Sequence, residues 1–206
     1  MSRPLRLFVS ATPDLEAERE VIGQVVARLP VTVGWEIKRT PRRGEPLPPA
    51  LEAVTACDFY LFLLGKDIAA PAGVEWDVAR RAGKKPLAYV KDVLHTPAAQ
   101  VFLRDTRVAW TRFASDEELW ELVQAALVER LLERAPAYGL SAVEHEALAA
   151  LLQKQKEEQP PTESPAVEGR PKGAAGGGVI LGPDSLPPGG VLVGAEGRVV
   201  NRVAGS

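Results

Sequence analysis

Six consecutive apolar residues, Phe59–Leu64, constrain the fold of this chain more than any other feature. A strand that faces water on one side alternates apolar and polar residues. An uninterrupted run is instead typical of a central strand that is covered on both faces. A parallel sheet between two layers of helices supplies that environment. An earlier run, Leu5–Val9, is followed by apolar residues at helical spacing from Leu15 to Leu29. The chain therefore begins as a buried strand leading into an amphipathic helix.

Strand-like and helix-like segments alternate through the first two thirds of the chain. We expect strands at Leu5–Ser10, Thr32–Ile37, Phe59–Leu64, Leu87–Lys91 and Arg107–Thr111. We expect helices at Asp14–Leu29, Pro49–Ala56, Val74–Ala82 and Ser115–Arg134. Five strands without a GxGxxG motif favour the flavodoxin-like strand order over a dinucleotide-binding Rossmann domain. The predicted fold class is α/β, with a five-stranded parallel sheet, helices on both faces, a C-terminal helix and a flexible tail.

The composition of the chain changes after this region. All aromatic residues lie at or before Tyr138, whereas residues 158–206 hold 11 of the 18 glycines and 7 of the 18 prolines. Such a segment buries too little apolar surface to offset its ordering entropy. We predict a folded domain over residues 1–136, a helical extension over 137–157 and a mostly disordered tail over 158–206. Similar stretches at Val179–Gly182 and Val191–Gly194 leave open a short β-forming segment that orders on a partner or neighbouring subunit.

An apolar stripe in the helical extension has two interpretations. Ser141 and Glu144 form a capping box at the start of this helix. The helix either docks on its own domain or contacts a protein partner acting in trans, which includes a second copy of the chain. The candidate partner-binding residues on the stripe are Val143, Leu148, Leu151 and Leu152.

A candidate ligand site lies where the first and third strands end. In the flavodoxin-like order these strands are neighbours, and their carboxyl ends frame a crevice. Gly65 follows the third strand and permits close backbone approach. Glu75 shares a helical face with Ala79 and Ala82, which indicates that this face packs on the sheet. We therefore expect five residues to converge at the crevice, namely Ser10, Thr12, Asp14, Gly65 and Glu75.

Several of these residues also have purely structural explanations. Thr12 precedes Pro13 and suits a helix N-cap, while Asp14 and Glu75 are favoured near helix N-termini by the helix dipole. Glu18 and Arg19 form either a solvated or interdomain ion-pair face or part of the site. A basic cluster also has two interpretations, because it is either part of a solvated loop or a contact for a phosphate. Its residues are Lys38, Arg39, Arg42 and Arg43.

Composition excludes several other classes of function. The net charge of -2 gives no reason to expect nucleic acid or an anionic membrane as partner. No apolar run approaches the ~20 residues that span a bilayer. The single Cys57 fits a reducing compartment, so we expect a cytoplasmic protein. His95 and His145 are isolated, and we expect no metal site. No GxSxG or P-loop motif occurs.

Three segments in the right order resemble the DUF4062 family. They are FVSATPDLEAERE, CDFYLFLLGKD and VEWDVARRAGKKPLAYV, and the resemblance extends from Leu5 to Lys91. It implies a flavodoxin-like fold related to TIR domains and nucleoside deoxyribosyltransferases, and a place in bacterial signalling and defence. The enzymes among these relatives use a glutamate at the position that Glu75 matches, which holds the ribose hydroxyls or attacks the anomeric carbon.

Two functions follow from the residues and the resemblance. One is a signalling or interaction module that binds a nucleotide-type ligand or a protein partner. The other is an NAD or nucleoside glycosidase in which the Glu75 carboxylate stabilises an oxocarbenium-like state. Ala69–Gly73 offer no side-chain hydrogen bond to a sugar, which favours the module. We expect no required cofactor, with NAD or a nucleotide as a possible ligand.

Overall fold

Five parallel strands form the central sheet, as the alternation of the sequence predicts. The order β2-β1-β3-β4-β5 is flavodoxin-like, because the chain adds strands on one side of β1 and then crosses to the other. Residues 3–158, 191–193 and 199–202 are described by this computed structural model. The strands are β1 (Leu5–Ala11), β2 (Trp35–Arg39), β3 (Phe59–Leu64), β4 (Leu87–Lys91) and β5 (Thr111–Phe113).

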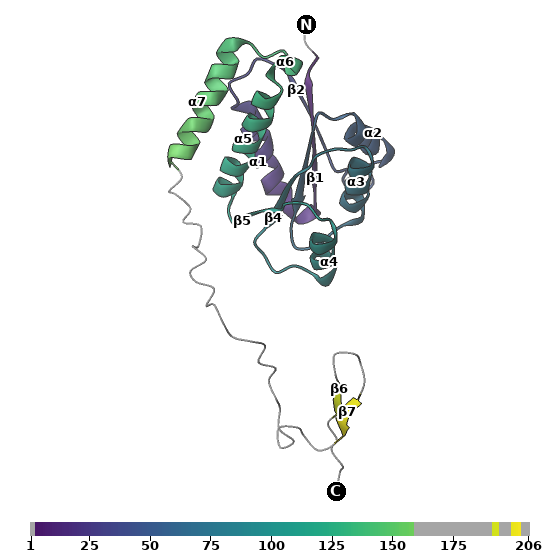
Figure 1. Cartoon of the computed structure of the whole chain (residues 1–206). Coiled ribbons are helices and arrows are strands. Elements are labelled where there is room, and N and C mark those ends of the chain that lie inside the picture. The colour runs from purple at the N-terminus through teal and green to yellow at the C-terminus, as the bar shows by residue number, and fades with distance from the viewer. Residues whose placement is uncertain (1–2, 159–190, 194–198, 203–206) are drawn as a thin grey trace. The chain divides into compact units, whose positions relative to one another are not determined.

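Helices cover both faces of the sheet (Figure 1). One face carries the 3-10 turn η1 (Pro13–Leu15), α1 (Glu16–Ala27) and α5 (Asp116–Glu133), which pack on residues such as Leu7 and Val9 of β1. The opposite face packs around Phe8 and carries α2 (Pro48–Ala56), α3 (Ala70–Arg81) and α4 (Pro97–Asp105). Successive residues of β1 therefore enter different cores, as the pleat of a strand requires.

All six residues of β3 are buried, which confirms it as a strand covered on both faces. On the α3 side, Phe62 contacts an aromatic cluster formed by Trp76, Phe102 and Trp110. The rings of Trp76 and Trp110 stack with centroids 5.7 Å apart and an interplanar angle of 15°. This cluster joins α3 and α4 to the middle of the sheet.

Several elements differ from the sequence prediction, among them the second strand, which is Trp35–Arg39 rather than Thr32–Ile37. Helix α3 begins at Ala70 rather than near Val74, so Glu75 lies in the second turn and not the first. Helix α4 was not expected; Pro97 starts it, and the Thr96 hydroxyl caps it by accepting from the Ala99 N–H at 3.2 Å. The fifth strand begins at Thr111, where the predicted strand Arg107–Thr111 ends.

The helical extension belongs to the same compact unit as the sheet. Gly139 takes a left-handed conformation, with φ of 68°, between α6 (Ala135–Tyr138) and α7 (Ala142–Glu158). Helix α7 packs against α5, and Leu148 is 0% exposed within the main core. Leu151 and Leu152 are partly buried against that core, while Val143 is 75% exposed. The prediction that Leu148 belongs to a partner-binding face is therefore wrong, because its own domain buries it.

Glu144 fastens the start of α7 to the domain. Its carboxylate accepts from the Thr32 N–H at 2.6 Å, the Thr32 hydroxyl at 2.8 Å and the Ser141 N–H at 2.7 Å. These donors, the Thr32 N–H first, lower the Glu144 pKa to about 2. The Glu144 of the predicted capping box thus also links the start of α7 to Thr32, which precedes β2.

Residues 161–206 form a separate unit, of which two short strands are described. Strands β6 (Val191–Val193) and β7 (Val199–Arg202) pair antiparallel, with Leu192 opposite Asn201. The rest of the predicted disordered tail, including Val179–Gly182, lies outside the described residues.

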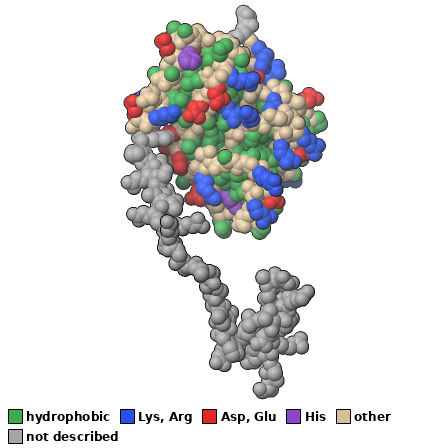
Figure 2. All heavy atoms as spheres, in the orientation of Figure 1, with side chains coloured by type: hydrophobic (Ala, Val, Ile, Leu, Met, Phe, Trp, Pro, Cys, Tyr) green, Lys and Arg blue, Asp and Glu red, His purple; other side chains and the backbone are tan. Residues whose placement is uncertain are grey.

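Within the described residues no helix is both long and apolar enough to cross a bilayer. Basic and acidic side chains are intermixed on the face of the molecule seen in Figure 2.

Candidate functional site

A buried carboxylate joins three elements at the carboxyl end of the sheet. Ser10 at the end of β1 donates a hydrogen bond to Glu75 Oε2 at 2.5 Å, across 65 positions of sequence. Thr40, which follows β2, donates to the same oxygen at 2.7 Å and accepts from the Ala11 N–H at 3.1 Å. All three polar side chains are buried. The structure therefore brings Ser10 and Glu75 together as expected, and it adds Thr40.

The environment of Glu75 favours its neutral form. Its side chain is 0% exposed, and this burial raises the pKa above the ordinary 4.5. The hydroxyls of Ser10 and Thr40, and then the charge of Arg19, oppose that rise. The second carboxyl oxygen, Oε1, has no hydrogen-bond partner among the described residues. A buried acceptor without a partner is costly, and such groups concentrate at functional sites.

Thr12, Asp14 and Gly65 join the loops after β1 and β3 to each other. The Thr12 hydroxyl accepts from the Gly65 N–H at 3.0 Å, and an Asp14 carboxylate oxygen accepts from the Lys66 N–H at 2.7 Å. Thr12 occupies the cap position of η1, but its side chain makes no capping hydrogen bond there. A Cβ on Gly65 would lie 2.1 Å from Asp14 Oδ2, so only glycine allows this approach.

This contact predicts a coupled effect of two substitutions. Gly65→Ala should lower the free energy of unfolding by about 1–2 kcal/mol, because the Asp14 carboxylate must leave the Lys66 N–H. In an Asp14→Ala background the same substitution should cost much less, since the obstructing atoms are gone. Urea unfolding of the four proteins in this cycle measures the coupling. Equal costs in both backgrounds would show that Asp14 is not what requires glycine here.

A cavity of about 770 Å³ opens next to the Glu75 network. Ala11 and Thr40 line it at the ends of β1 and β2, Pro41–Glu45 and Leu47 form one wall, and Ala69, Pro71 and Ala72 form another. Its remaining lining includes Glu16 and Arg19 of α1. The sequence predicted a crevice between the first and third strands. The cavity lies instead toward β2, because the Thr12–Gly65 and Asp14–Lys66 hydrogen bonds close the β1–β3 side.

Glu75 and Ser10 do not line this cavity. Thr40 and Ala72 do, and they lie next to Glu75 through the hydrogen bond to Thr40 and one turn of α3. Glu75 thus contacts the cavity only through neighbouring residues, and its hydrogen bond with Thr40 fixes the start of the β2–α2 loop.

Sequence reasoning underestimated the burial of Glu18 and Arg19. Glu18 is 2% exposed and forms an ion pair with Lys91, so it belongs to no solvated face. The Arg19 side chain is 9% exposed and donates to the Ala11 carbonyl at 2.8 Å. Asp58 lies at the other end of the sheet, where it accepts from the Arg3 side chain and from the Arg6 N–H.

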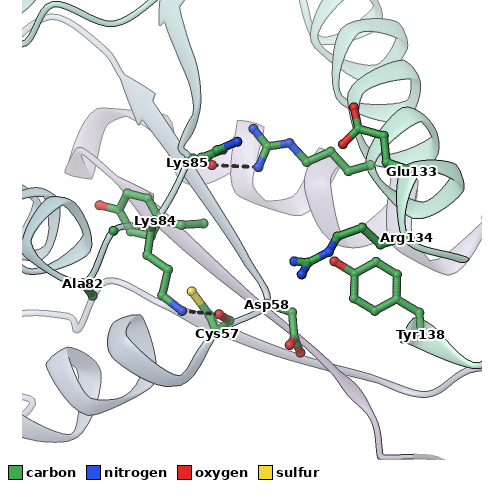
Figure 3. A pocket seen from close by; sticks show the side chains of 11 residues that line it. Cys57, Asp58, Ala82, Lys84, Lys85, Glu133, Arg134 and Tyr138 are labelled. Atoms are coloured by element: carbon green, nitrogen blue, oxygen red, sulfur yellow. Dashed lines mark hydrogen bonds between the residues drawn. The ribbon is translucent and has the colours of Figure 1, made fainter. Parts of the chain in front are cut away.

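A second cavity, of about 720 Å³, lies at the amino end of the sheet (Figure 3). Its basic residues lie at and beyond the C-terminal ends of α3 and α5, where the helix dipole favours positive charge. Lys84 donates to the Cys57 carbonyl at 2.5 Å, and Arg130 donates to the Lys85 carbonyl at 2.7 Å. Lys84 and Arg130 thus satisfy backbone carbonyls next to the starts of strands, which is a structural role. The carboxyl-end cavity is therefore the better candidate for a ligand site.

No group of three or more potential metal ligands occurs in the part of the chain that the structure describes. Comparison of the chain with protein-family models and with curated proteins finds no match. The geometry of the carboxyl-end cavity is therefore the basis for assigning a function.

Proposed function

We propose that this chain is a TIR-like signalling module that binds a nucleotide-type ligand in the carboxyl-end cavity and passes the signal to a protein partner or a second copy. The supporting observation is the cavity itself, which combines an apolar wall with arginines. Ala69, Pro71, Ala72 and Leu47 offer the apolar contacts that a base or sugar requires. Arg19, Arg42 and Arg43 offer the charge that phosphates require.

The position of the cavity supports the same proposal. In open α/β sheets, ligands bind outside the carboxyl ends of the strands, near the point where the strand order reverses. Here the order reverses between β1 and β3, and the cavity lies beside that point, at the carboxyl ends of β1 and β2, where Ala11 lines it. The resemblance to DUF4062 favours a place in bacterial signalling or defence.

Ligand binding can be tested by filling the cavity. Titration calorimetry with NAD, ADP and adenosine should detect binding of at least one probe to the full chain. Ala69→Tyr should weaken that binding at least tenfold, about 1.4 kcal/mol, because Ala69 lines the cavity. Ala70→Tyr is the matched control, since Ala70 is exposed and does not line it. If wild type binds none of the three probes, the proposal fails.

A glycosidase is the second candidate, because Glu75 is a buried carboxyl with one unpartnered oxygen. Such a group suits stabilisation of an oxocarbenium-like state. Glu75 does not line the cavity, however, and this favours the binding module over the glycosidase. Incubation with NAD decides between the two. We expect no release of nicotinamide; release that Glu75→Gln abolishes would establish the enzyme.

A further inference from the structure

Glu16 holds together two arginines of the cavity that come from different elements. Its Oε2 accepts from Arg19 Nη1 at 2.5 Å, and its Oε1 accepts from Arg42 Nη2 at 2.7 Å. Arg19 belongs to α1, whereas Arg42 lies on the loop between β2 and α2. One carboxylate thus bridges the helix and the loop, both of which line the cavity.

The two arginines differ in how firmly they are held. Arg19 is 9% exposed, and its Nη2 is fixed on the Ala11 carbonyl. The Arg42 side chain is 64% exposed and Glu16 is 45% exposed. Ion pairs this open to water contribute little to stability, so the Glu16–Arg42 pair can be displaced at little cost. The hydrogen bond from Arg42 also lowers the pKa of Glu16, which keeps the Glu16 carboxylate ionised.

A phosphoryl group is suited to replace this carboxylate. It carries more negative charge than Glu16, and it presents several oxygens to guanidinium groups in the same way. Arg43 also lines the cavity and makes no hydrogen bond or ion pair within the described part of the chain. The site therefore contains one fixed arginine, one displaceable arginine and one unpaired arginine.

We propose that a phosphoryl group of the ligand displaces Glu16 from Arg42 and Arg19, so that Glu16 sets the selectivity of the cavity between phosphorylated and neutral ligands. This rests on the proposed function, because it concerns a ligand bound in the same cavity. The carboxylate competes with the ligand for both guanidinium groups. Removing its charge should therefore strengthen binding of a phosphorylated ligand and leave a neutral one unaffected.

The experiment compares ADP with adenosine, which share base and sugar and differ in the phosphates. Titration calorimetry on the full chain should show that Glu16→Gln raises ADP affinity by about fivefold or more, roughly 1 kcal/mol, with adenosine affinity unchanged. Glu20→Gln is the matched control. It removes the same charge from the exposed part of α1 but breaks no hydrogen bond or ion pair of the described residues. It should change ADP affinity less than twofold.

Arg42→Gln tests whether Arg42 is the group for which Glu16 and the ligand compete. This variant should weaken ADP binding, and in its background Glu16→Gln should give a much smaller gain. If ADP binds but Glu16→Gln leaves its affinity unchanged or lowers it, Glu16 does not compete and the inference fails while the proposed function stands. If neither wild type nor Glu16→Gln binds ADP, adenosine or NAD, the proposed function fails and this inference with it.

Discussion

Leu148→Asp is expected to lower the free energy of unfolding of the domain by about 4 kcal/mol or more. Leu148 is 0% exposed in the core between α7 and the rest of the domain. The substitution removes a buried leucine side chain and places a carboxylate inside an apolar core. Denaturant unfolding, followed by circular dichroism, measures the loss.

The matched control for this substitution is Val143→Asp on the same helix. Val143 is 75% exposed, so its replacement should change stability by less than about 0.5 kcal/mol. If both variants were equally stable, α7 would not be docked as the structure shows. A partner surface on α7 would in turn have to use its exposed side, which includes Val143 and excludes Leu148.

Glu75→Ala is expected to cost about 3 kcal/mol of stability. It leaves a small cavity under α3, and it leaves the Ser10 and Thr40 hydroxyls without their common acceptor. Glu75→Gln should cost less, because an amide oxygen accepts from the same two hydroxyls. Thr40 holds the start of the β2–α2 loop, so Glu75→Ala should also weaken ligand binding without any direct contact.

The pH dependence of Glu75→Gln separates burial of a charge from loss of a hydrogen bond. Burial raises the Glu75 pKa above 4.5, so its contribution to stability is complete below that pH. The contribution is lost as the pH rises through the raised pKa and the carboxyl ionises in the core. Glu75→Gln cannot ionise, so its stability relative to wild type should be higher at pH 8 than at pH 4. The opposite trend would mean that the ionised form is stabilised in the folded protein.

Much of the fold follows from local sequence. The apolar run Phe59–Leu64 predicts β3 with its observed bounds, and Leu87–Lys91 predicts β4 equally well. Helix α4 was missed because Pro97–Asp105 is short and its start depends on the Thr96 cap and Pro97. Helix α7 left two interpretations open, since an apolar stripe does not say which surface covers it. Only the contact with α5 decides that.

The site was predicted in part. Ser10 and Glu75 follow from strand order and helical spacing, which bring distant residues to one end of the sheet. Thr40 was missed, although β2 neighbours β1 in the predicted order and the residue after its end must lie near Ala11. The Glu16–Arg42 pair has no such signal, because the path of a proline-rich loop is set by tertiary contacts.

The aromatic cluster gives this protein an internal optical probe. Trp76 is the residue directly after Glu75 on α3, and its indole stacks on that of Trp110. Any rotation of α3 that moves the carboxyl group also changes the overlap of the two indoles. Emission wavelength and near-ultraviolet dichroism should therefore register events at the cavity without an attached dye.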